Sequence, residues 1–111
     1  MKDRRRQPRV LVRYLGTFST MQRASGEGIV LDLSLGGCRV ESSRDVQLGT
    51  ELALSISMPN QVTPLAVDRA VVRWGHGHQF GLCFMSLRPE EQARLRRLVV
   101  SPRPGAALSC E

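Results

Sequence analysis

The segment that decides the fold reads Leu52-Ala53-Leu54-Ser55-Ile56-Ser57-Met58, and it is followed by Pro59-Asn60. Large apolar residues alternate in it with small or polar ones, and this period of two places the apolar side chains on one face of an extended chain. Proline cannot donate to a sheet ladder and asparagine tolerates turn conformations, so the pair ends the pattern. The sequence therefore predicts a half-buried β-strand over residues 52–58.

The residues that follow contain two more strand signals with a turn between them. Residues 65–74 are rich in valine, and residues 80–84 alternate between large apolar and small side chains. Gly75-His76-Gly77-His78 separates them, and the two glycines suit a tight turn. These segments predict a pair of strands joined by a short connection.

A helix is predicted after the last of these strands. Residues 88–92 place a proline in the first turn and two glutamates behind it, close to the positive end of the helix dipole. Leu95, Leu98 and Val99 are spaced i, i+3 and i+4, so they form one apolar stripe. Two prolines and a glycine at 102–105 end the helix, and residues 101–111 are expected to form a disordered tail.

Three further strand signals lie before residue 52, and turn signals separate them. The strands are expected over residues 10–18, 29–31 and 38–41, and the turns over residues 25–28, 32–37 and 47–49. The whole pattern is mainly β and favours a small antiparallel barrel or sandwich. We expect a six-stranded antiparallel β-barrel with a C-terminal α-helix, spanning residues 10–100.

Positive charge is concentrated at the start of the chain. The 111 residues carry a formal net charge of +6, and the first 13 residues contain Asp3 as their only acid. The basic residues there are Lys2, Arg4, Arg5, Arg6, Arg9 and Arg13. Since Pro8 disfavours helix for itself and for Gln7, residues 1–9 are expected to form a flexible basic arm. Local charge of this kind indicates an anionic partner such as a nucleotide, a nucleic acid or a phospholipid.

The arm contains the pattern R-x-x-x-R, made by Arg5 and Arg9. Arginine presents a planar fork of donors that binds phosphate, or the O6 and N7 atoms of guanine, in bidentate fashion. A short basic segment is also common as a solvated arm without a specific ligand. The pattern by itself is therefore not specific.

Residues 32–37 contain a second pattern, [D/N]-x-S-x-x-G, made by Asp32, Ser34 and Gly37. A carboxylate can accept the N1–H and N2–H donors of guanine, and a serine hydroxyl can bind phosphate or base. Gly36 and Gly37 allow a ligand to approach the backbone closely. On its own, the same pattern is common in tight turns with an Asx-type hydrogen bond.

The two patterns occur together, the first just before the first strand and the second between the next two strands. In this order and spacing they resemble the PilZ domain family, and residues 71–74 followed by 80–84 look like its closing strands. The resemblance covers roughly residues 4–100. It implies a β-barrel that binds the bacterial second messenger cyclic di-GMP (c-di-GMP) and is not an enzyme.

The resemblance assigns roles to particular residues. Arg5 and Arg9 would grip the phosphates and guanines, the second pattern would contact guanine and the ligand backbone, and the residue at Arg4 would influence whether one or two ligands bind. The candidate ligand-binding residues are Arg4, Arg5, Arg6, Arg9, Asp32, Ser34, Gly36 and Gly37. Ligand is expected to order the arm and so to change a surface for a protein partner or for self-association.

Other functions stay open at this stage. A PilZ-like interaction module without a ligand would typically lack these motif residues, and a nucleic-acid-binding barrel would show aromatics interleaved with basic residues, whereas aromatics are only 5% here. His76 and His78 lack a third metal ligand nearby, and Trp74 is expected in the core or at the barrel rim. Without an apolar signal stretch or membrane segment, and with three cysteines, the chain is expected in the cytoplasm.

Overall fold

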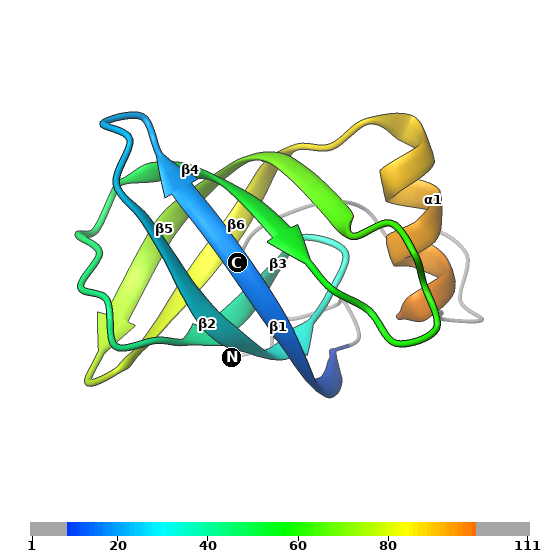
Figure 1. Cartoon of the computed structure of the whole chain (residues 1–111), viewed down its shortest axis with the longest axis horizontal. Coiled ribbons are helices and arrows are strands. Elements are labelled where there is room, and N and C mark those ends of the chain that lie inside the picture. The colour runs from blue at the N-terminus through cyan, green and yellow to red at the C-terminus, as the bar shows by residue number, and fades with distance from the viewer. Residues whose placement is uncertain (1–8, 100–111) are drawn as a thin grey trace, which may run out of the picture.

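The computed structural model describes residues 9–99 and shows a closed barrel followed by one helix (Figure 1). All neighbouring strands are antiparallel, and their order around the barrel is β1-β2-β3-β6-β5-β4, with β4 pairing back to β1. The elements are β1 Val10–Thr20, β2 Ser25–Leu33, β3 Gly37–Glu41, β4 Glu51–Ile56, β5 Leu65–His76, β6 Gln79–Ser86 and α1 Pro89–Leu98. The predicted fold class is confirmed. The expectations for the arm before Arg9 and for the tail lie outside the described residues.

The core lies inside the barrel and follows the alternation of the strands. Val30 and Val40 face each other on β2 and β3, and Ile56 of β4 shares their complete burial. Phe18 and Phe80 pack edge to face within the core, with their ring centroids 5.7 Å apart. Burial of each such side chain contributes about 1.5–3 kcal/mol, so apolar packing within the barrel is the main source of its stability.

The predicted turn at residues 25–28 is wrong, because these residues begin β2. The chain reverses just before them, where Arg23 adopts a positive φ of 68° and the amide of Ala24 donates to the Thr20 hydroxyl at 3.2 Å. Gly28 instead serves close packing, since a Cβ there would lie 2.6 Å from the carbonyl oxygen of Glu41. The glycines looked like a turn signal in the sequence, but a strand also needs glycine where another backbone approaches closely.

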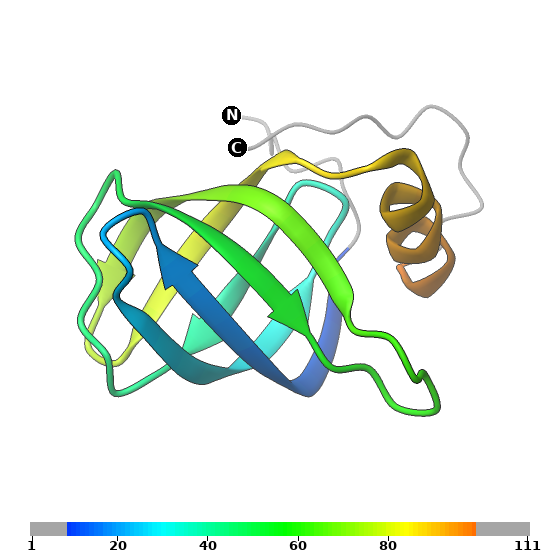
Figure 2. The same cartoon turned by 45° about the horizontal axis from the view of Figure 1, so that its top comes forward.

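The helix α1 packs at one end of the barrel, and the β5–β6 hairpin forms the opposite end (Figures 1 and 2). Leu95 and Val99 are each 1% exposed and join the core. Glu91 accepts a hydrogen bond from the amide of Ala66 at 3.0 Å, and Arg94 donates to the carbonyl oxygens of Thr63 at 2.6 Å and Pro64 at 3.1 Å. The helix is therefore held to the start of β5 by both apolar and charged contacts. Within residues 9–99, no helix is long and apolar enough to cross a membrane.

Candidate ligand-binding site

Asp32 lies near the end of β2, and a β-bulge decides which way its side chain points. Val30 pairs with Val40, but the next pair joins Asp32 to Arg39, so Leu31 is an extra residue in the ladder. Simple alternation from the buried Val30 would turn Asp32 into the core. The bulge puts Asp32 on the same face as Arg39 and lets Leu33 enter the core, as bulges beside functional sites often do.

Two arginines surround the carboxylate of Asp32. Its Oδ1 accepts hydrogen bonds from Arg9 Nη1 at 3.0 Å and from the backbone amide of Arg39 at 3.1 Å. Its Oδ2 lies 3.4 Å from Arg39 Nε. The carboxyl side chain is 9% exposed, whereas those of Arg9 and Arg39 are 43% and 35% exposed. The cluster therefore carries one net positive charge at the surface of the barrel.

The turn between β2 and β3 is built by the other residues of the second motif. The Ser34 hydroxyl donates to the carbonyl oxygen of Gly37 and accepts from the amide of Gly36, both at 3.3 Å. The carbonyl oxygen of Gly36 accepts from the amide of Phe84 at 2.8 Å, which ties the turn to β6. Gly37 is needed because a Cβ would overlap the carbonyl oxygen of Leu82. In this structure Ser34, Gly36 and Gly37 are buried and shape the turn that presents Asp32.

A second bulge brings Trp74 to the same face. Val72 pairs with Leu82, and the next pair joins Trp74 to Gly81, so Arg73 is the extra residue. Trp74 is 43% exposed, and its indole covers Gly81, where a Cβ would overlap the ring nitrogen. Trp74 therefore lies outside the core, on the outward face of β5 near the β5–β6 hairpin at the end of the barrel.

The strand register sets these residues in one row. Asp32 pairs with Arg39, Arg39 with Gly81, and Gly81 with Trp74, so the row crosses β2, β3, β6 and β5. Arg39 and Trp74 were not among the candidate residues from the sequence. The two bulges hide the row, because each reverses the alternation from which a sequence pattern is read.

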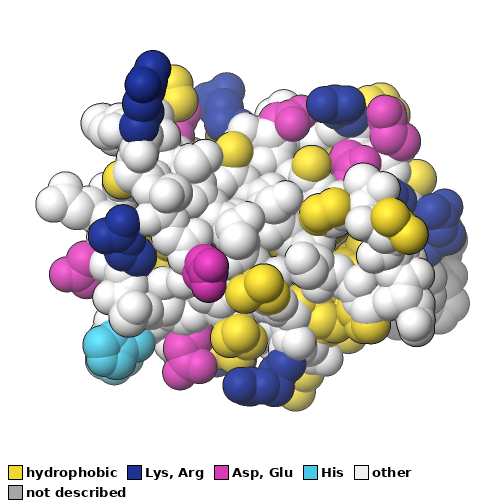
Figure 3. All heavy atoms as spheres, viewed as in Figure 1, with side chains coloured by type: hydrophobic (Ala, Val, Ile, Leu, Met, Phe, Trp, Pro, Cys, Tyr) yellow, Lys and Arg dark blue, Asp and Glu magenta, His cyan; other side chains and the backbone are white. Residues whose placement is uncertain are grey.

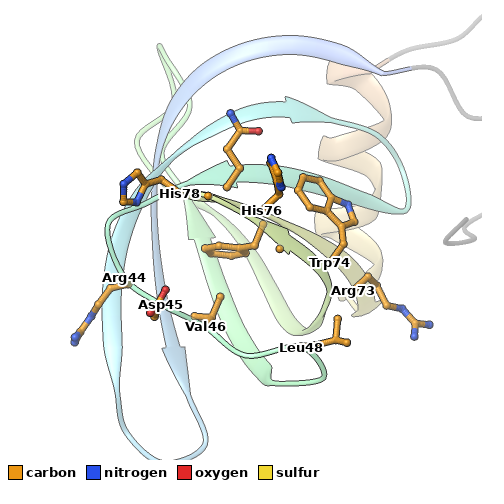
Figure 4. A pocket seen from close by; sticks show the side chains of 12 residues that line it. Arg44, Asp45, Val46, Leu48, Arg73, Trp74, His76 and His78 are labelled. Atoms are coloured by element: carbon orange, nitrogen blue, oxygen red, sulfur yellow. The ribbon is translucent and has the colours of Figure 1, made fainter.

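The cavity beside Trp74 has a different character. It has a volume of about 550 Å³ and lies between the β3–β4 connection and the β5–β6 hairpin. Figure 4 shows Val46 and Leu48 along it and Trp74 at its edge, while the side chains of Arg44 and Arg73 point away from it. Arg44 is engaged with the carbonyl oxygen of Ser25, to which its Nε donates at 3.0 Å. The charged cluster at Asp32 is therefore the better anion-binding feature.

Cys38 lies directly behind the cluster, on the inner face of β3. Burial raises the pKa of its thiol well above the ordinary value, the Asp32 carboxylate raises it further, and the Arg9 guanidinium lowers it by less. The thiol is therefore protonated at neutral pH and acts as a small core side chain.

The structure brings together all the candidate residues that it describes. Arg9 directly precedes β1, whose start lies beside the β2–β3 turn (Figure 2), and its ion pair reaches Asp32. Ser34, Gly36 and Gly37 belong to the same turn region as Asp32. Arg4, Arg5 and Arg6 lie outside the described residues. The geometry defines a small β-barrel domain with a charged, partly aromatic site on its outer wall.

The chain belongs to the PilZ domain family, whose model matches residues 3–101. Among solved structures, the PilZ domain of YcgR from Escherichia coli with c-di-GMP is 18% identical with a TM-score of 0.71, covering 87% of this chain and 89% of that one. The Bacillus subtilis inhibitor of motility MotI is 18% identical with a TM-score of 0.71, covering 89% and 50%.

YcgR from Escherichia coli in complex with c-di-GMP is 20% identical with a TM-score of 0.74, covering 87% of this chain and 45% of that one. This chain thus spans about half the length of both MotI and that YcgR chain. At these identities the likeness establishes the fold. No match was found among curated proteins.

Proposed function

We propose that this chain binds c-di-GMP and acts as a second-messenger sensor or adaptor in the cytoplasm. The observation that carries the proposal is the ion pair between Arg9 and Asp32, 3.0 Å long, which joins the two sequence motifs across 23 residues. It sets a carboxylate acceptor beside an arginine donor on an outer wall. Guanine offers the matching donors at N1 and N2 and the matching acceptors at O6 and N7.

The proposed roles follow from this placement. Asp32 accepts from the Watson–Crick edge of one guanine, and Arg9 contacts a phosphate or the other base. Trp74 offers a flat, 43% exposed aromatic surface on which a base can stack. The turn of Ser34, Gly36 and Gly37 holds Asp32 in place. Two YcgR structures that resemble this chain contain c-di-GMP, which supports the same ligand class here.

We propose further that the ligand orders the arm that carries Arg4, Arg5, Arg6 and Arg9. The two phosphates of c-di-GMP would attract these arginines onto the wall near Asp32, and the new surface would be read by a protein partner or by a second copy. This is a population shift through the ordering of a segment. The net positive charge of the cluster at Arg9, Asp32 and Arg39 would also attract the phosphates of the ligand to this wall.

Nucleic-acid binding has weaker support. On the face shown in Figure 3, basic and acidic side chains are interspersed around the edge, which is not the continuous basic stripe that a nucleic-acid backbone requires. A steep loss of affinity for random-sequence DNA with rising salt would be the sign of that function.

The test of c-di-GMP binding is isothermal titration calorimetry on the wild type and on the double variant Arg5→Ala/Arg9→Ala. We expect binding at micromolar concentration or below in the wild type and none in the double variant. The matched control is Arg96→Ala/Arg97→Ala, which removes the same charge from exposed positions on α1 and should bind like the wild type. The fitted stoichiometry distinguishes one ligand from two. Absence of heat in the wild type, confirmed by equilibrium dialysis, would instead favour a ligand-free interaction module.

The test of arm ordering is ¹⁵N relaxation of the backbone amides of residues 2–9, excluding Pro8, with and without c-di-GMP. The order parameters should rise on ligand binding to the range of rigid backbone, about 0.85. Unchanged order parameters alongside normal binding would reject this mechanism and leave the binding function intact.

A further inference from the structure

Arg39 is the one charged side chain in the row that neither sequence motif contains. It lies on β3 between two outward-turned residues, with Asp32 on one neighbouring strand and, beyond Gly81, Trp74 on the other side. Its position is set by the pairing of β3 with β2 and β6. Unlike Arg9, which precedes the first strand, it is held within the sheet by pairs on both sides.

The hydrogen bonding of the Arg39 side chain is incomplete, and the exposed part of the side chain faces outward. Its backbone amide donates to Asp32 Oδ1 at 3.1 Å, so the backbone is held in place. Its Nε is buried and lies 3.4 Å from Asp32 Oδ2, yet within residues 9–99 it makes no hydrogen bond. The side chain is still 35% exposed, and this exposure falls on the rest of the side chain because Nε itself is buried.

The acceptor next to it is also incompletely used. Within the described residues, Asp32 Oδ1 receives two hydrogen bonds, whereas Oδ2 lies 3.4 Å from Arg39 Nε and receives none from it. An acceptor oxygen and a guanidinium group therefore lie side by side, and both have hydrogen-bonding capacity left by their neighbours in residues 9–99. Guanine presents the complement of this pair, because its N1–H donor is adjacent to its O6 acceptor, and O6 is adjacent to N7.

We propose that Arg39 is a specificity-determining residue that donates from its terminal nitrogens to O6 and N7 of the guanine whose N1–H is accepted by Asp32. This rests on the proposed binding of c-di-GMP and names a base contact within that site. The pair reads two edges of one base, so it selects guanine over adenine, which carries an amino donor in place of O6. The indole of Trp74, which covers Gly81 beside Arg39, lies where it can cover the face of that base.

The first experiment measures c-di-GMP affinity by isothermal titration calorimetry in the wild type, Arg39→Ala, Arg39→Lys and Arg96→Ala. Arg39→Ala should weaken binding about tenfold to a hundredfold. Arg39→Lys should be similarly weak, because lysine keeps the charge beside Asp32 but lacks the fork. Arg96→Ala removes the same charge from an exposed position and should bind like the wild type. Wild-type affinity in Arg39→Lys would overturn the proposal.

The second experiment separates a base contact from a merely structural role for Arg39. The probe is a c-di-GMP analogue in which carbon replaces N7 in both guanines. The wild type should bind this analogue about tenfold more weakly than c-di-GMP, and Arg39→Ala should bind the two ligands equally. If Arg39→Ala keeps the full penalty for the missing N7, Arg39 only positions Asp32 and the proposal is rejected.

Far-ultraviolet circular dichroism and urea unfolding of each variant verify that it is folded at the titration temperature. If Arg39→Ala is not folded, Arg39→Lys supplies the same comparison with a positive charge retained beside Asp32. If the wild type binds neither ligand, the proposed function itself has failed. That outcome differs from a wild type that binds c-di-GMP without regard to Arg39.

Discussion

At the scale of single residues, the site depends on a partly buried carboxylate that is held by two arginines. Asp32 is 6% exposed, and its Oδ1 is also the acceptor for a backbone amide of β3. A buried carboxylate is tolerated only with such partners, and removal of the acid would leave the backbone amide of Arg39 without its acceptor and the Arg39 guanidinium without its counter-charge. The same residue therefore serves both the stability of the β2–β3 ladder and the proposed binding of guanine.

Replacement of this acid should destabilise the fold. Asp32→Ala should lower the free energy of unfolding by about 1–3 kcal/mol, moderated because Arg9 and Arg39 remain partly exposed to water. The control is Glu51→Ala, which breaks an exposed pair with Arg69 at the same 3.0 Å distance and should cost less than about 1 kcal/mol. Urea unfolding followed by circular dichroism measures both. An equal decrease in the free energy of unfolding for both variants would show that burial does not increase the contribution of the Asp32 cluster to stability.

The glycine of the second motif should be structurally indispensable. Gly37→Ala should lower the free energy of unfolding by about 1–3 kcal/mol, because the added Cβ overlaps the Leu82 carbonyl oxygen and pushes β3 from β6. Gly75→Ala is the control, since a Cβ there meets only the Gln79 carbonyl oxygen at 3.9 Å. Thermal unfolding of both variants provides the comparison. A stable Gly37→Ala protein would mean that β3 and β6 can separate without loss of packing.

At the scale of elements, the two bulges have more influence on the site than any motif. Each adds one residue to a strand and so reverses the faces of all residues after it. Asp32 and Trp74 are turned outward in this way, while Leu33 stays in the core. The helix α1 contributes separately to stability. Glu91 attaches it to the beginning of β5, and Arg94 attaches it to the loop before β5.

The attachment of α1 should be measurable through Arg94. Arg94→Ala removes donors to the carbonyl oxygens of Thr63 and Pro64 and should lower the free energy of unfolding by about 1 kcal/mol. Arg96→Ala, at an exposed position of the same helix, should change it by less than about 0.5 kcal/mol. The difference in urea midpoint between the two variants is the readout. No difference would assign the docking of α1 to Leu95 and Val99 alone.

At the scale of the whole molecule, closure of the barrel leaves no free edge among its strands, because β4 pairs with β1. Its interior is then reached only when the ladder opens. Cys38 is a suitable reporter, since it is a buried free thiol at 3% exposure on β3, paired with Leu33 of β2 and Leu82 of β6.

Burial raises the pKa of Cys38, and this makes two outcomes testable. In the native protein, labelling of Cys38 by iodoacetamide should be much slower than in urea at every pH between about 8 and 9, because the buried thiol stays protonated and is reached only when the ladder opens. Peptide mass mapping measures the labelled fraction. Native labelling at the rate seen in urea would contradict a closed interior.

The same raised pKa links stability to alkaline pH. The unfolded chain loses the Cys38 proton first, so the contribution of the thiol to stability is complete below about pH 8.5 and declines above it. The slope should reach about 1.4 kcal/mol per pH unit for this group. Cys38→Ala should show a flatter decline than the wild type in urea titrations between about pH 8 and 10. Identical slopes would mean that Cys38 ionises alike in both states.

The local patterns were sufficient for most of the fold. Alternation over residues 52–58, the turn between β5 and β6 and the apolar stripe of α1 each reflect interactions within a few residues, so they are visible in the sequence. The turn is shorter than the predicted 75–78, because Gly75 and His76 are still paired in β5. The motif spacing also predicted the family. The turn at 25–28 was wrong because glycine serves both turns and close strand contacts, and only the neighbouring strand reveals which is needed.

The sequence by itself thus determined the antiparallel barrel and its C-terminal helix, and it singled out Arg9 and Asp32, which the structure joins by an ion pair. Only the tertiary structure decided that Arg39 and Trp74 belong beside them. The physical reason is the register of the ladder: two extra residues, Leu31 and Arg73, reverse the alternation of their strands, and pairing across four strands then aligns Asp32, Arg39, Gly81 and Trp74. Such pairing is set by contacts between distant segments, which no local pattern contains.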